Sequence, residues 1–179
     1  MQVLERDKKE IEIRVSKMSD FLKMEYLESC LKKFSDHEIQ KFCCVELSRL
    51  YESKFMYLEA VKYIFKFQEL SGNPMEKKRA SQKEIELLIK GGFYDKAESV
   101  VKKTLTMLND SEKMELKRNI VSWYKVIGEK AERMGRNAEI IKVYEKILPY
   151  TSDNERNHIK LKLIDSYKKL GKIREAIEL

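Results

Sequence analysis

Residues that could coordinate a metal or act as nucleophiles are few and poorly spaced. Cys43 and Cys44 are adjacent, so on a helix their side chains point about 100° apart. Neither has a second cysteine at the two-to-four-residue spacing of a zinc site. His37 lies near a predicted helix start, His158 is the only other histidine, and the sequence suggests no Ser/His/Asp or Cys/His nucleophile arrangement for either. We therefore predict no metal site and no catalytic residues.

Sequence motifs for cofactor chemistry are also missing. There is no G-x-x-x-x-G-K-[ST] loop, no G-x-G-x-x-G turn and no H-E-x-x-H helix. The glutamates are scattered along Lys/Glu-rich segments, which is typical of solvated helix surfaces rather than of the paired carboxylates used in acid–base catalysis. The sequence predicts a protein that is not an enzyme and needs no cofactor.

Basic residues cluster most densely at Lys77-Lys78-Arg79 and at Lys117-Arg118. Such clusters could contact the phosphates of nucleic acids. Stacking aromatic residues are not interleaved with them, which disfavours nucleic acid as the partner. The net charge is +7, but acidic and basic residues alternate throughout, which favours a mildly basic, solvated helix surface.

The elements that would position these residues are helices. Hydrophobic residues make up 42% and charged residues 37% of the chain, with only 6 Gly and 2 Pro, a composition that favours helix. Apolar residues recur at spacings of three, four or seven, and no segment alternates as a strand would. The predicted helices cover about 2–17, 20–34, 36–53, 56–70, 75–90, 94–108, 112–134, 137–148, 153–170 and 173–179. One long bent helix is the alternative for the first two.

The cellular setting is predicted from what is missing. Three cysteines, two of them adjacent, form no disulfide framework. Charged residues already occur within the first seven positions, which lack the apolar run of a signal peptide. No stretch approaches the roughly 18 apolar residues that span a bilayer. We expect a soluble cytoplasmic protein with no membrane insertion.

A repeated pattern surrounds the predicted turns. Tyr167 lies four residues before Gly171, and Ala176 five residues after it. The same frame fits at Gly135 and Gly92. Further residues that fit are Gly128, Ile140 and Tyr144 around Gly135, Leu88 and Ala97 around Gly92, and Leu47, Tyr51 and Ala60 around Phe55, which replaces the turn glycine. This pattern resembles the tetratricopeptide repeat family, in which helix A ends at a turn glycine and a small residue follows on helix B.

The resemblance implies an all-α fold: an α-α superhelix, or solenoid, of about four to five antiparallel helical hairpins. Residues 1–34 would form an N-terminal helical hairpin, and 35–179 the repeats, with the last apparently incomplete, in one continuous solenoid. The steps between the glycines exceed the family's period of about 34 residues. An unrelated helical bundle or another α-solenoid is the alternative.

The resemblance also implies a function, because helix A residues line the concave wall in this family. The chain would be a scaffold or adaptor that holds a peptide or protein in its groove. The groove positions, four on each helix A, are Phe42, Val45, Arg49, Glu52, Arg79, Gln82, Glu86, Ile89, Ser122, Lys125, Glu129, Glu132, His158, Leu161, Asp165 and Lys168. The alternative for each is a merely solvated residue. The asparagine clamp that binds chaperone tails would need Asn where Glu46, Lys83, Val126 and Lys162 stand, so no such binding is predicted.

Two further functions remain alternatives: a regulatory repeat domain that senses a signalling peptide, and a basic solenoid that binds nucleic acid. The last predicted helix bears on self-association. Ile173, Ala176, Ile177 and Leu179 offer an apolar surface with little after them. A solenoid needs a polar cap over its last apolar face. The chain is therefore expected to be a fragment of a longer repeat protein, or to pack on another chain through this helix.

Overall fold

The computed structural model describes residues 3–179, and this part of the chain contains ten α-helices, one short 3₁₀ turn and no strand. The all-α prediction is therefore confirmed. The helices are α1 Lys8–Ser16, α2 Asp20–Lys33, α3 His37–Ser53, α4 Tyr57–Leu70, α5 Pro74–Lys90, α6 Tyr94–Leu105, α7 Asp110–Arg133, α8 Asn137–Ile147, α9 Asp153–Lys169 and α10 Ile173–Ile177, with the 3₁₀ turn at Leu148–Tyr150. None is long and apolar enough to cross a membrane.

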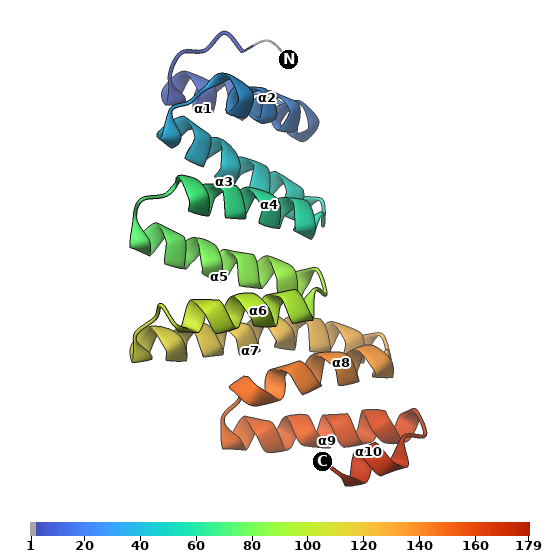
Figure 1. The fold of residues 1–179 in the computed structure, drawn as a ribbon. Coiled ribbons are helices and arrows are strands. Elements are labelled where there is room, and N and C mark those ends of the chain that lie inside the picture. The colour runs from blue at the N-terminus through green and yellow to red at the C-terminus, as the bar shows by residue number, and fades with distance from the viewer. Residues whose placement is uncertain (1–2) are drawn as a thin grey trace. The chain divides into compact units, whose positions relative to one another are not determined.

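The chain divides into two compact units, Met1–Thr104 and Leu105–Leu179. The boundary expected after residue 34 falls inside the first unit. Within that unit α2, α3, α4 and α5 each contact the next along the chain, and within the second unit α7, α8, α9 and α10 do the same. Figure 1 shows the consecutive helices α3 and α4 running antiparallel, joined by a short turn.

Helix starts follow the local capping chemistry. The Asp36 carboxylate accepts a hydrogen bond from the Ile39 amide at 2.9 Å, and Asn109 and Glu112 form a reciprocal capping box at the start of α7. The first helix begins at Lys8, later than predicted, because Asp7 caps it by accepting from the Glu10 amide at 2.9 Å. Residue 2, the first of the predicted helix, lies outside the described part.

Turns between paired helices use the left-handed backbone conformation. Gly92, Gly135 and Gly171 have φ values of 77°, 65° and 72°, a region that costs glycine little. Phe55 occupies the equivalent place between α3 and α4 with φ 59°. The structure thus confirms that Phe55 stands where the repeat frame has a glycine.

Small residues lie where paired helices cross. Ala60, Ala97 and Ala176 are buried. A Cβ atom added to Gly128 on α7 would lie 2.4 Å from Cε1 of Tyr144 on α8, so only glycine allows this approach. The family resemblance implies that Gly128 is the small residue of a close contact between helices A and B, and this contact is present between α7 and α8.

The core of the first unit lies between these helices. One buried cluster joins α1, α2 and α3 through residues such as Ile11, Leu27 and Leu47, and a second joins α4 and α5 through Ala60, Ile64, Ala80 and Leu87. These clusters hold α3, α4 and α5 side by side, which positions the groove described below.

Candidate functional site

A groove of about 690 Å³ lies on α3, α4 and α5 in the first unit. Its lining, which we call the α3–α5 groove, consists of Val45, Ser48, Arg49, Glu52, Ile64, Phe67, Glu76, Arg79, Ala80 and Lys83. The volume falls within the range of about 300–1,000 Å³ that is typical of ligand pockets. Apolar side chains from all three helices contribute to it, and charged side chains stand on α3 and α5.

The register of α3 explains why these residues share a face. Val45, Ser48, Arg49 and Glu52 are spaced by three, one and three residues, which places them along one side of a helix. The opposite side carries Cys43 and Leu47, which are fully buried in the core.

Most charges of the α3–α5 groove are neutralised by neighbours. Glu52 forms ion pairs with Lys83 and with Lys90, each at 2.8 Å, and Arg49 pairs with Glu46 at 2.6 Å. Burial alone would raise the pKa of Glu52, but the hydrogen bonds from the two lysines outweigh it and lower the pKa.

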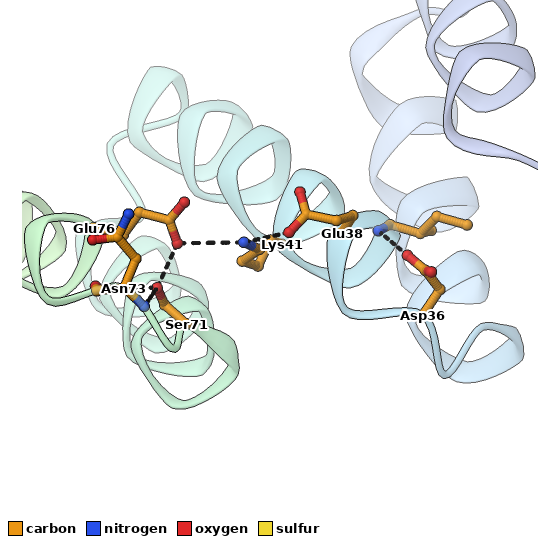
Figure 2. A network of polar contacts seen from close by, with 7 residues as sticks. Asp36, Glu38, Lys41, Ser71, Asn73 and Glu76 are labelled. Atoms are coloured by element: carbon orange, nitrogen blue, oxygen red, sulfur yellow. Dashed lines mark hydrogen bonds and ion pairs between the residues drawn. The ribbon is translucent and has the colours of Figure 1, made fainter.

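The Glu76 carboxylate is held at the start of α5 (Figure 2). Lys41 of α3 lies between Glu38, at 2.5 Å, and Glu76, at 3.3 Å. The Ser71 hydroxyl donates to Glu76 as well, and this bond, followed by the contact with Lys41, lowers the pKa of Glu76 despite the opposing effect of burial. The network ties the start of α3 to the start of α5.

Two polar groups of the groove have no such partner. Arg79 is exposed and forms no ion pair within residues 3–179. Ser48 is only 1% exposed, and its hydroxyl has no hydrogen-bond partner in the same part of the chain. An unsatisfied buried hydroxyl costs about 1–3 kcal/mol.

The structure brings some predicted site residues together and separates others. Arg49 and Arg79 share the α3–α5 groove, with Val45 and Glu52. Phe42 lies outside it, packed against the core of the first unit with the Lys8 Nζ atom 5.7 Å from its ring centroid.

The remaining predicted residues lie elsewhere. Gln82 is half-buried, and Glu86 pairs with Lys83 and Lys90. Ile89 is fully buried and therefore cannot line an open groove. In the second unit, Lys125 lines a groove of its own, Glu129 and His158 are exposed, and Asp165 pairs with Lys169 at 2.6 Å.

Sequence reasoning missed Ser48, Ile64, Phe67, Glu76, Ala80 and Lys83. Ser48 could have been found from the α3 register, since it lies three residues after Val45. Ile64 and Phe67 belong to the helix B face of α4, for which the family resemblance implies no groove role.

Metal binding finds no support among the described residues. Residues 3–179 contain no group of three His, Cys, Asp or Glu side chains that could hold a metal ion. Cys30, Cys43 and Cys44 are free thiols that are fully buried. Burial raises the pKa of the Cys44 thiol to about 11, so at neutral pH it is protonated.

Comparisons with known proteins identify no family. No protein-family model matches the chain, and no curated protein sequence matches it. Among solved structures, the chain is similar to BtubC (BKLC) from P. vanneervenii, with a TM-score of 0.41 and 13% identity, over 95% of this chain and 72% of that chain.

Proposed function

We propose that the chain is a non-catalytic binding protein that holds a peptide segment of a protein partner in the α3–α5 groove. The observation that carries the proposal is the groove itself: about 690 Å³ in volume, with apolar side chains among paired charges. In this proposal the helical hairpins form a solenoid of the tetratricopeptide kind that works as a scaffold or adaptor in the cytoplasm.

Arg79 is the residue that we expect to bind the polar groups of the peptide segment. The other charges of the groove, Arg49, Glu52, Glu76 and Lys83, already have partners. Arg79 has none within residues 3–179, so its guanidinium can donate to a carboxylate or a carbonyl of the bound segment without breaking an existing pair. Hydrogen bonds that involve a charged group contribute about 1.5–3 kcal/mol.

The experiment selects peptides from a random display library on the purified chain and measures their affinity by fluorescence anisotropy. Arg79→Glu should weaken binding by about tenfold or more, since tenfold corresponds to about 1.4 kcal/mol. Lys77→Glu is the matched control, because Lys77 is an exposed cation on the same helix outside the groove lining. Selected peptides that bind both variants equally well would show that the groove is not the site.

Ser48→Ala gives a second test, in which the unfolding free energy and the peptide affinity are expected to change differently. The substitution removes a buried hydroxyl that has no partner, so the unfolding free energy should stay the same or rise. If the hydroxyl serves the ligand, affinity should fall. Equal losses of stability and affinity would instead assign Ser48 a structural role.

A further inference from the structure

A second groove, of about 590 Å³, lies within the second unit between α7 and the segment that joins α8 to α9. We call it the α7–α9 groove. It is lined by Met114, Lys117, Arg118, Val121, Ser122, Lys125, Pro149, Tyr150, Thr151, Ser152 and Glu155. The α7 residues recur at helical spacing and form one face, while the 3₁₀ turn Leu148–Tyr150 and the start of α9 form the opposite wall.

The charges of this groove do not balance. Lys125 is paired with Glu155 at 2.6 Å, and that pair accounts for the one acidic residue of the lining. Lys117 and Arg118 are exposed and form no ion pair with any residue of the described chain. Two positive charges therefore remain without a counter-charge.

A neighbouring hollow in the same unit shows the contrast. It is lined by Glu132, Lys162, Asp165 and Lys169 among others. There Lys162 pairs with Glu132 at 2.7 Å and Lys169 with Asp165 at 2.6 Å, so its charges are balanced. An uncompensated surplus of positive charge is thus not a general property of the hollows in this unit.

The start of α9 supplies no counter-charge for Lys117 and Arg118. Ser152 and Glu155 form a reciprocal capping box there, and the hydrogen bond from Lys125, followed by that from Ser152, lowers the pKa of Glu155. The carboxylate of Glu155 thus already occupies this end of the groove. An incoming anion would meet Lys117 and Arg118 on α7 instead.

Apolar side chains accompany the two free cations. Met114 is 64% exposed although it lines the groove, and Pro149 and Tyr150 are part of the same lining. Methionine is flexible and polarisable, which suits it to contact varied apolar groups. The groove therefore offers an apolar contact next to a surplus of positive charge.

We propose that the α7–α9 groove binds an acidic peptide segment in which two carboxylates lie beside an apolar side chain. The carboxylates would neutralise Lys117 and Arg118, and the apolar side chain would pack on Met114 and Pro149. A single-stranded nucleic acid fits less well, because one tyrosine and two free cations supply few stacking and phosphate contacts. The proposal is independent of the function proposed for the α3–α5 groove.

The experiment titrates the full chain with a fluorescein-labelled peptide that contains two adjacent Asp residues next to Leu, and with the same peptide carrying Asn for Asp. The Asp peptide should bind, more weakly as salt rises, and the Asn peptide should not. Each exposed ion pair contributes little by itself, but reversing both charges in Lys117→Glu/Arg118→Glu replaces two attractions by two repulsions and should weaken binding about tenfold. The neutral pair Lys117→Gln/Arg118→Gln should give an intermediate loss.

Lys130→Glu/Arg133→Glu is the matched control, because it makes the same change in net charge on exposed residues of α7 outside the groove. It should leave binding unchanged. Equal losses in control and groove variants, equal affinity for the Asn peptide, absence of binding, or tighter binding of oligouridine would each overturn the proposal. Loss of Asp-peptide binding in Arg79→Glu would place the peptide in the α3–α5 groove, so this proposal would fail while the other stood.

Discussion

Replacing Gly128 by Ala tests the closest helix contact in the second unit. The added Cβ atom would lie 2.4 Å from Cε1 and 2.8 Å from Cζ of Tyr144, which is far inside van der Waals contact. The ring cannot retreat easily, because Tyr144 is 2% exposed and its hydroxyl donates to Glu132 at 2.6 Å. Lys162 also covers the ring, with its Nζ atom 5.5 Å from the ring centroid.

The expected magnitude follows from three effects. Overpacking a core costs about 1–3 kcal/mol, and displacing the Tyr144 hydroxyl from the Glu132 carboxylate costs about 1.5–3 kcal/mol if the bond is lost. Alanine is favoured over glycine in a helix interior by about 1 kcal/mol. We expect Gly128→Ala to lower the unfolding free energy by about 2 kcal/mol or more, since the first two effects exceed the third.

The assay is urea unfolding followed by the fluorescence of Trp123, which is the single tryptophan of the chain and lies on α7. In a Tyr144→Leu background the ring atoms that would collide are gone. There, Gly128→Ala should instead raise the unfolding free energy by up to about 1 kcal/mol. The same loss in both backgrounds would refute the explanation, because it would show that the ring is not the obstacle.

Two other predictions concern the first unit. Phe55→Gly should be more stable than Phe55→Ala by about 0.5–1 kcal/mol in the same unfolding assay, followed by circular dichroism, because φ 59° penalises any residue with a Cβ and the entropy of glycine offsets only part of that gain; equal stability would contradict this strain. The unfolding free energy should fall on acidification below about pH 4.5, less steeply in Glu52→Gln than in the wild type. Partial burial of Glu52 alone would raise its pKa, yet Lys83 and Lys90 lower the pKa below the usual value of 4.5. The contribution of Glu52 is therefore present above the unfolded-state pKa and lost as pH falls through the folded one; identical pH profiles would show that these pairs contribute nothing.

Local sequence patterns predicted most of the helices and the turns between them. The four-before, five-after frame placed Phe55 where the other turns have glycine, because Tyr51 and Ala60 matched, but the left-handed conformation of Phe55 itself was not predicted. Gly128 was identified from the family resemblance, as the small residue of a close helix contact. The predicted start of the first helix at residue 2 is wrong, because Asp7 caps α1 and Leu4, whose spacing to Ile11 suits a helix, lies before the cap and is 74% exposed.

The site was harder to predict, because it depends on contacts between helices. Helical spacing placed Arg49 and Glu52 on the same face of α3, as the groove lining shows. It could not show that Glu52 meets Lys83 and Lys90 from α5, or that Ser48 is buried rather than solvated. Phe42 followed the same spacing, yet it packs against the core near Lys8, because neighbouring helices decide which part of a helix face stays open.

The two grooves differ in how many of their charged side chains form ion pairs, and this difference depends on the tertiary structure. It should appear as a difference in the salt dependence of peptide binding. Tyr150 is distant in sequence from Lys117 and Arg118, and the 3₁₀ turn between α8 and α9 brings it into their groove. The two cations there without an ion pair in the described part of the chain, Lys117 and Arg118, attract an anionic ligand electrostatically. Salt weakens this attraction, because the Debye length is about 10 Å at 0.1 M ionic strength. In the α3–α5 groove Arg79 is the one charged residue without an ion pair to any residue of 3–179, so apolar contact contributes a larger share of binding. Peptide affinity should therefore fall more steeply with salt in the α7–α9 groove, and equal slopes would contradict this assignment of charges.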